Sequence, residues 1–248
     1  MYQLFQYLRN CVIFTLLCLV LTWSFPAQAA NRISSQLEQQ VIQILREHPD
    51  VIIDSVQAYQ QQQQQQVNQI RQAFLQDFKT NPQAVIGDSP TTSAAQSKAV
   101  VIEFSDFQCP YCAEAHKTLK QLLAKHQGEL TLVYKHLPLI PIHDQAMPAA
   151  KAAWAANQQG KFWEYHDALF TNQKRLGEAL YLETANKLNL DLEKFNSDRR
   201  LADSAISQDI QLAQKLAISG TPFFIMNSKN FSGGLQLSEI ESKLAEAS

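Results

Sequence analysis

Residues 99–112 read AVVIEFSDFQCPYC, and the order of these letters decides the fold class. The first six are mostly apolar, a pattern typical of a buried strand. Cys109 and Cys112 follow, with Pro110 directly after the first, and proline is favoured in the first turn of a helix. A second apolar run, 130–134, lies beyond that helix. The sequence therefore predicts a strand–helix–strand unit in which the two strands are parallel.

The spacing of Cys109 and Cys112 at a helix N-terminus is predicted to bring both sulfurs within bonding distance. We expect the first sulfur to face solvent and the second to lie behind it. Free N–H groups and the helix macrodipole stabilise the Cys109 thiolate, which lowers its pKa below the usual value of about 8.5. Pro110 has no N–H, so the remaining donors can point at the sulfur. A stabilised thiolate is a good leaving group, so the pair indicates thiol–disulfide exchange.

Two other interpretations of the cysteine pair compete with redox chemistry. A structural zinc site takes four ligands, and the sequence offers no second Cys-x-x-Cys. His116, one turn beyond Cys112, is either a third ligand or a surface residue. A structural bridge across two residues constrains the unfolded chain little. Redox chemistry therefore fits best and we assign no resident metal, while Cu(I) binding by the thiols of Cys109 and Cys112 is the alternative function.

Glu103 is a carboxylic acid within an otherwise apolar strand, six residues before Cys109. Buried below a redox site, such an acid has its pKa raised by desolvation. It can then exchange a proton with Cys112 while a mixed disulfide resolves. The other interpretation is a carboxylate at the strand end that reaches solvent.

Thr221 and Pro222 lead into a third predicted strand, 222–226. Proline cannot donate to a strand ladder, so it belongs at a strand start, and a bond before proline is where a cis peptide costs least. A cis bond would leave the Thr221 backbone open to pair with a substrate strand. From the sequence alone, such a residue is more often an ordinary loop proline.

The composition narrows the function classes. The 248 residues are 46% hydrophobic and carry a formal charge of -2, without a basic stripe, which argues against nucleic acid as a partner. Seven glycines and no glycine-rich phosphate loop argue against a nucleotide enzyme. The chain is long enough for one full-sized domain and an accessory segment.

Residues 1–29 are predicted to be a signal peptide. Arg9 precedes an uncharged apolar run, 11–23, that is shorter than a membrane-spanning helix, and small residues follow it. Cleavage near Ala29 would remove two of the four cysteines. We therefore expect a protein exported to the periplasm or another extracytoplasmic space of the cell envelope.

Residues 30–80 are predicted to be a helical oligomerisation segment. Ser34 and Ser35 offer N-caps, and Pro49 separates two helices. An apolar stripe runs along the second helix and passes through the glutamine run 60–66, which we interpret as helix rather than as a low-complexity linker. Such a stripe has to be covered, so we expect a homo-oligomer that forms through residues 31–80. Residues 81–98, rich in Pro, Ser, Thr and Ala, are predicted to be a linker.

Helical spacing predominates between about 140 and 205, and a fourth strand is predicted at 230–233. Ser238 is predicted to cap a final helix. The six histidines, including His143 and His166, have no spacing that indicates function, and we expect surface or capping residues.

These motifs together resemble the DsbA-like branch of the thioredoxin superfamily over residues 99–248. The resemblance implies an α/β thioredoxin fold with a helical insertion at about 140–205. It implies that Cys109 is the attacking and Cys112 the resolving cysteine, with Glu103 as the buried acid. It implies that Thr221-Pro222 is the substrate-binding cis-proline loop.

The resemblance also bears on how the enzyme would act. Pro110 and Tyr111 would tune the redox potential, and Pro-Tyr is similar to what isomerase relatives carry in place of Pro-His. The N-terminal block 37–66 resembles the oligomerising stalk of ScsC-type proteins. The implied partners are unfolded or misoxidised exported proteins and a membrane redox partner, and the implied redox group is the disulfide Cys109–Cys112 with no organic cofactor. Oxidation, isomerisation and reduction of substrate disulfides are all compatible with the sequence, because reduction potential and assembly state decide among them.

Overall fold

The computed structural model describes residues 6, 34–92, 97, 99–226 and 237–246. The predicted signal peptide and the predicted strand 230–233 lie outside the described residues. Within the described part of the chain, no helix has both the length and the apolar character needed to cross a membrane. The chain divides into two compact units, residues 1–60 and residues 61–248.

Two helices occupy the segment that precedes the sheet. Helix α2 spans Ser35–Glu47, and the Ser34 side chain caps it by accepting a hydrogen bond from the Leu37 backbone N–H. Helix α3 spans Pro49–Thr80 and continues through the glutamine run without interruption. The prediction of two helices separated at Pro49 is confirmed.

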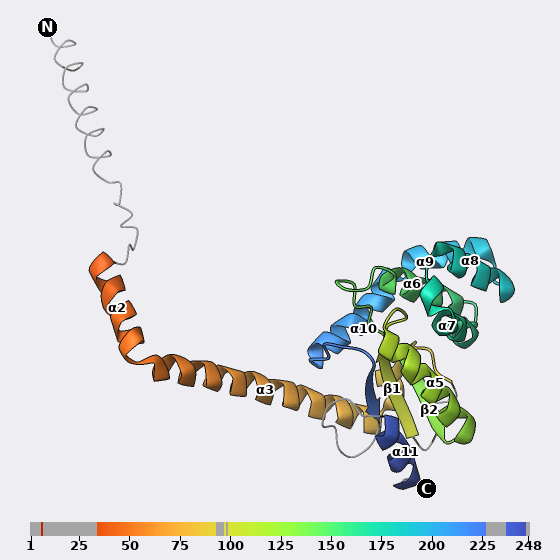
Figure 1. Cartoon of the computed structure of the whole chain (residues 1–248), viewed down its shortest axis with the longest axis horizontal. Coiled ribbons are helices and arrows are strands. Elements are labelled where there is room, and N and C mark those ends of the chain that lie inside the picture. The colour runs from red at the N-terminus through yellow and green to blue at the C-terminus, as the bar shows by residue number, and fades with distance from the viewer. Residues whose placement is uncertain (1–5, 7–33, 93–96, 98, 227–236, 247–248) are drawn as a thin grey trace. The chain divides into compact units, whose positions relative to one another are not determined.

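A three-stranded sheet forms the centre of the unit 61–248. Its strands are β1, Ala99–Ser105, β2, Leu130–His136, and β3, Phe223–Met226. The strand order is β2-β1-β3, with β1 parallel to β2 and antiparallel to β3. All residues of β1 and β2 are buried, which agrees with their apolar sequences. The predicted parallel pair is thus confirmed (Figure 1).

The remaining elements are helices, most of them inserted between β2 and β3. The inserted helices α6 to α9 gather at one end of the sheet in Figure 1. The bounds are α4 Pro82–Ile86, α5 Pro110–Lys125, α6 Ala146–Asn157, α7 Phe162–Thr171, the 3-10 turn η1 Gln173–Arg175, α8 Glu178–Lys187, α9 Leu192–Leu201, α10 Asp203–Lys215 and α11 Leu237–Glu246. Helix α11 begins one residue before Ser238, so Ser238 is not its cap.

The two faces of the sheet are covered by different helices. Side chains alternate along β1, so Val100, Ile102 and Phe104 pack on one face with residues of α3 and α10. Ala99 and Val101 pack on the other face with residues of α5 and α11. Glu103 lies two residues after Val101 and therefore belongs to the same face of the strand as Ala99 and Val101. The alternation therefore directs its carboxyl toward the face that α5 covers.

The C-terminal part of α3 belongs to the core of the thioredoxin-like unit, which differs from the predicted boundary at residue 80. Leu75 and Phe78 are buried in the same cluster as the sheet residues, and Arg71 Nε donates to the Leu216 carbonyl at 2.9 Å. The lower end of the apolar stripe is thus covered within the chain itself. The part of the stripe upstream of residue 60 stays exposed.

The segment predicted as a linker, 81–98, is in part structured. It contains α4, whose Ile86 is buried in the core, and Thr91 forms an antiparallel bridge with Val133 at the edge of β2. The Trp163 indole N–H donates to the Thr91 carbonyl at 2.8 Å. Backbone pairing at the open edge of the sheet explains why this part of the segment is structured. A prediction from composition does not detect such pairing.

Candidate redox active site

The two cysteines lie where β1 ends and α5 begins. Asp106 forms the turn between them and the strand, because its Oδ1 accepts from the Gln108 N–H at 2.8 Å and its carbonyl accepts from the Cys109 N–H at 3.1 Å. Cys109 is the N-cap residue of α5, and Pro110 occupies the first helical turn. Cys112 lies in that same turn, so both sulfurs meet the helix N-terminus as predicted.

Cys109 is less open to solvent than the sequence predicts. It is 4% exposed and Cys112 is 0% exposed, so the expectation that the first sulfur faces solvent is wrong. The reason is the loop before β3, because the Cys109 thiol donates to the Thr221 carbonyl at 3.4 Å. Tyr111 between the cysteines is 74% exposed and marks the outer surface of the site.

The environment makes Cys109 acidic. A hydrogen bond from the Cys112 thiol lowers the pKa of Cys109 most, burial opposes this, and Thr221 and the N–H groups of Tyr111 and Cys112 lower it further, to about 5. Cys109 is therefore a thiolate at neutral pH. The two cysteines are not joined by a disulfide in this structure.

The second thiol and the nearby acid have the opposite shift. Burial, the hydrogen bond to Cys109 and the negative charge of Glu103 raise the pKa of Cys112. Burial also raises the pKa of Glu103 from 4.5 to about 7, although the hydroxyl of Ser105 opposes the shift. Glu103 is 1% exposed and its Oε1 has no hydrogen-bond partner among the described residues. The interpretation of Glu103 as a solvent-reaching carboxylate is thus wrong.

The peptide bond between Thr221 and Pro222 is cis, in agreement with the DsbA-like resemblance. The Thr221 hydroxyl is buried and makes no hydrogen bond to the described part of the chain. In the thiol form, Cys109 donates to the Thr221 carbonyl, whereas a thiolate needs donors. The unpaired hydroxyl is a donor available to that thiolate, consistent with its lowering of the Cys109 pKa.

Three residues hold the cysteine loop in place, a role that the sequence analysis assigns to none of them. Gln173 Nε2 donates to the carbonyls of Phe107 and Cys109, each at 2.9 Å. Asp106 Oδ2 accepts from His143 Nδ1 at 2.7 Å. No local motif marks Gln173, because it approaches the loop from η1, more than sixty residues away along the chain.

The expectation of surface histidines is wrong for part of the set. His136 and His166 are each 3% exposed, and their ring nitrogens have no hydrogen-bond partners within the described residues. His143 pairs with the buried Asp106. Aromatic rings of α7 and β2 surround His166, so tertiary packing encloses a side chain whose spacing in the sequence indicates nothing.

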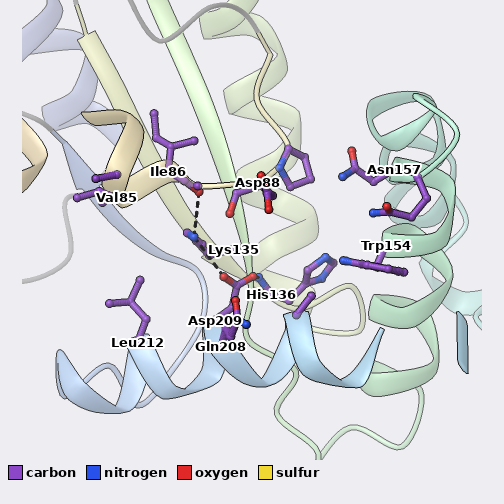
Figure 2. A pocket seen from close by; sticks show the side chains of 16 residues that line it. Val85, Ile86, Asp88, Lys135, His136, Trp154, Asn157, Gln208, Asp209 and Leu212 are labelled. Carbon is purple, nitrogen blue, oxygen red and sulfur yellow. Dashed lines mark hydrogen bonds and ion pairs between the residues drawn. The ribbon is translucent and has the colours of Figure 1, made fainter. Parts of the chain in front are cut away.

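Two cavities lie outside the thiol pair. One of about 670 Å³ lies between the segment 84–90, β2, α6 and α10, and Figure 2 shows His136 beside Trp154 in it. Lys135 there donates to the Ile86 carbonyl at 3.3 Å and pairs with Asp209 at 3.3 Å. The second, of about 840 Å³, lies against α5 and is lined by His116, Lys120 and Gln173 among others. Neither cysteine lines either cavity.

Comparison with known proteins agrees with this geometry. The thioredoxin family model matches residues 79–246. A thioredoxin-like oxidoreductase from Silicibacter pomeroyi DSS-3 is 29% identical with a TM-score of 0.59, over 68% of this chain and 98% of that chain. The thiol–disulfide exchange protein alpha-DsbA2 from Wolbachia pipientis has a TM-score of 0.60 at 20% identity, over 71% of this chain and 97% of that chain.

ScsC from Proteus mirabilis is similar over more of the chain. It covers 86% of this chain and 95% of its own length, with a TM-score of 0.58 and 20% identity, which shows a shared fold. Curated relatives include a Na(+)/H(+) antiporter NhaA from Salinispora tropica, 37% identical over 155 residues. The chain spans only 24% of the length of that relative, so the similarity concerns one part of the antiporter.

The match to the family model covers more than half of the chain and includes the strand, the cysteine turn and the cis-proline loop. Its structural neighbours include a thioredoxin-like oxidoreductase and a thiol–disulfide exchange protein, which supports the broad class of thiol–disulfide oxidoreductase. The chain therefore belongs to the thioredoxin family, and its fold is that of the DsbA- and ScsC-like members.

Proposed function

We propose that the protein is an exported thiol:disulfide oxidoreductase that oxidises or isomerises disulfides in cell-envelope proteins. The observation that carries the proposal is the divergence in acidity of two adjacent thiols. Cys109 has a pKa of about 5 and Cys112 a raised pKa, beside a buried acid. This pattern favours one sulfur as nucleophile and leaving group and keeps the other protonated until it acts.

In isomerisation, the Cys109 thiolate attacks one sulfur of a substrate disulfide. A bond forms between Cys109 and that sulfur, the substrate disulfide breaks, and the other substrate sulfur leaves as a thiolate. A different substrate thiolate then attacks the substrate sulfur of the mixed disulfide and releases Cys109. No net electrons are transferred, and the substrate leaves with a rearranged disulfide.

In oxidation, the enzyme starts with the Cys109–Cys112 disulfide. A substrate thiolate attacks Cys109, and the sulfur of Cys112 leaves. A second substrate thiolate attacks the mixed disulfide and releases Cys109, so two electrons pass from the substrate to the cysteine pair. The low pKa of Cys109 makes it the better leaving group in this last step. The reaction needs no organic cofactor, because the sulfurs carry the electrons.

Glu103 is the proton acceptor and donor for Cys112 in this scheme. Its pKa of about 7 means that both protonation states are populated at neutral pH. When Cys112 leaves as a thiolate, protonated Glu103 supplies a proton, and when Cys112 attacks, the carboxylate takes the proton back. A carboxyl with an ordinary pKa would be ionised at neutral pH, so it would have no proton to supply to Cys112.

The exposed stripe of the first unit supports assembly into a homo-oligomer. Helix α2 has no buried residue, and apolar side chains along it and along the start of α3 are exposed. They are Leu37, Val41, Ile42, Ile44, Leu45, Val51, Ile52, Ile53, Val56 and Tyr59. A second copy of the same stripe is the proposed cover. The proposed substrates are unfolded or misoxidised exported proteins, with a membrane protein that resets the redox state.

The first test separates isomerase from oxidase. Catalytic amounts of the chain without residues 1–29 are added to scrambled, fully oxidised ribonuclease in a redox buffer and, separately, to reduced ribonuclease. Recovery of ribonuclease activity from the scrambled protein indicates an isomerase, and rapid oxidation of the reduced protein indicates an oxidase. The Cys109→Ser variant is expected to lose either activity, and full turnover by that variant would refute the proposal.

The alternative function, Cu(I) binding by Cys109 and Cys112, predicts a different result. The reduced protein would bind Cu(I) tightly, and ribonuclease would be neither oxidised nor reshuffled. Among the described residues, the potential metal ligands that cluster in groups of three do not include either cysteine. Cu(I) would therefore have to be bound by the two thiolates alone.

A further inference from the structure

A cluster of three potential metal ligands lies next to the redox helix. His116 comes from α5, and His166 and Asp167 are consecutive residues of α7, a helix that packs against α5 (Figure 1). One ligand atom from each residue lies within 4.8 Å of the other two. His116 is one helical turn beyond Cys112, so the cluster connects the active-site helix to the inserted helices.

The distances fit a small, near-tetrahedral ion. Asp167 Oδ1 lies 3.6 Å from His116 Nε2 and 3.5 Å from His166 Nδ1. Ligand bonds of 2.0–2.1 Å to zinc place adjacent ligands of a tetrahedron about 3.4 Å apart. The two measured separations are thus close to the edges of such a tetrahedron, with the carboxylate oxygen shared by both.

The ring of His166 is poorly compensated for its burial. It is 3% exposed, its Nε2 has no hydrogen-bond partner within the described part of the chain, and its Nδ1 makes only the 3.5 Å contact with Asp167 Oδ1. Buried polar groups without good partners are rare in folded proteins because their desolvation is not compensated. A metal ion between Nδ1 and Asp167 Oδ1 would replace this long contact with two coordination bonds.

The donor atoms of the cluster suit a transition-metal cation. His116 and His166 offer imidazole nitrogens and Asp167 a carboxylate oxygen, which are donor types that zinc takes in proteins. Lys120 Nζ donates to Asp167 Oδ2 at 2.7 Å, so the ammonium holds the oxygen that does not face the histidines.

We propose that His116, His166 and Asp167 form a binding site for a divalent first-row transition-metal ion, with Zn²⁺ the best match to two imidazoles and one carboxylate. Three protein ligands leave a fourth position for water, and His116 also lines the cavity of about 840 Å³ beside α5. The bound ion would join α5 to α7 and so fix the helix that carries Cys112. The site is separate from the thiol chemistry and does not depend on the proposed exchange activity.

The test measures Zn²⁺ binding to the full chain by titration calorimetry, after oxidation until no free thiol remains, so that the cysteines cannot bind the ion. Binding of one Zn²⁺ per chain and a higher thermal midpoint with Zn²⁺ are expected, with Mg²⁺ as the inactive comparison ion. His116→Gln and Asp167→Asn should each weaken Zn²⁺ binding about 100-fold or more, since loss of an outer-shell partner alone costs 10–100-fold.

Matched controls come from the same chain. His126→Gln alters a histidine of similar exposure at the end of α5, and Asp203→Asn alters an ion-paired aspartate elsewhere. Both should bind Zn²⁺ as the unaltered chain does. If a ligand variant unfolds, the visible absorption spectrum of the unaltered oxidised chain loaded with Co²⁺ is the second test. Bands of tetrahedral Co²⁺ without a sulfur charge-transfer band would support the site. Absence of those bands, absence of Zn²⁺ binding, or equal affinity in the ligand variants would overturn the proposal.

Discussion

Glu103 shows how one buried side chain connects stability with redox chemistry. Its position in β1 directs the carboxyl toward the α5 face, where no hydrogen-bond donor among the described residues compensates Oε1. Burial therefore favours the protonated acid, and the same effect makes Glu103 available as a proton donor near neutral pH. The inward direction of the carboxyl and its raised pKa both follow from the position of Glu103 in β1.

Glu103→Gln is expected to stabilise the fold at high pH. The folded-state pKa of about 7 lies above the ordinary 4.5, so the folded chain holds the proton longer and stability falls as pH rises between these values. The penalty is complete above about pH 7 and corresponds to about 3 kcal/mol at 1.36 kcal/mol per unit. Urea unfolding at roughly pH 8 should show that gain, and at roughly pH 4 almost none.

The exposed Glu114→Gln is the control for this prediction, because Glu114 lies on the outer face of α5. It should change the free energy of unfolding little at either pH. A Glu103→Gln effect of the same size at both pH values would contradict the assigned pKa. If Glu103 moves the proton of Cys112, the variant should also resolve mixed disulfides more slowly.

Thr221→Val is expected to raise the pKa of Cys109. The substitution keeps the shape of the side chain but removes the hydroxyl, one of the groups that lower this pKa. The rate of alkylation of the reduced protein, measured against pH, should show a midpoint near 5 in the unaltered chain and a higher one in the variant. Thr118→Val, on an exposed part of α5, should leave the midpoint in place. An identical profile for Thr221→Val would exclude the hydroxyl as a thiolate donor.

At the scale of elements, α3 has two different environments along one continuous helix. Its first part carries exposed apolar residues, whereas Leu75 and Phe78 near its end are buried against the sheet. A period of 3.6 residues does not distinguish these cases, because both need an apolar stripe. The N-terminal limit of the thioredoxin-like unit is therefore set by packing and lies near residue 61.

Phe78→Ala should destabilise the thioredoxin-like unit. The side chain is 0% exposed, and loss of a buried phenylalanine leaves a cavity that costs about 3–5 kcal/mol. Gln76→Ala, at an exposed position of the same helix, should change the free energy of unfolding by no more than about 0.5 kcal/mol. Urea unfolding, followed by far-ultraviolet circular dichroism, compares the two variants. Equal losses of stability would mean that this end of α3 does not contribute to the core.

At the scale of the whole molecule, the exposed stripe is the proposed contact between copies of the chain. Val41→Glu together with Ile44→Glu places charges on exposed positions of α2, so an oligomer formed through this stripe should dissociate. Sedimentation of the chain without residues 1–29 measures the change, and Gln40→Glu with Gln43→Glu adds the same charge to polar positions of α2 as a control. Unchanged sedimentation of the first pair would show that another surface holds the copies together, or that the protein is a monomer.

The sequence by itself determined the features that depend on local chemistry. The apolar run of β1, the proline after Cys109 and the Pro49 break each act within a few residues, and the predicted strand–helix–strand unit and the two N-terminal helices are present. The broad family also followed from such local motifs, because the cysteine turn, the acid in the strand and the late Thr-Pro pair occur together.

Only the tertiary structure decided what approaches these motifs from distant parts of the chain. The loop of Thr221 covers Cys109, η1 brings Gln173 to the carbonyl of Cys109, and α5 and α7 bring His116 to Asp167. Burial, hydrogen bonding and pKa depend on which groups surround an atom. Some of those groups lie more than a hundred residues away in the sequence. Periodicity and spacing describe one segment at a time, so they contain no information about these contacts.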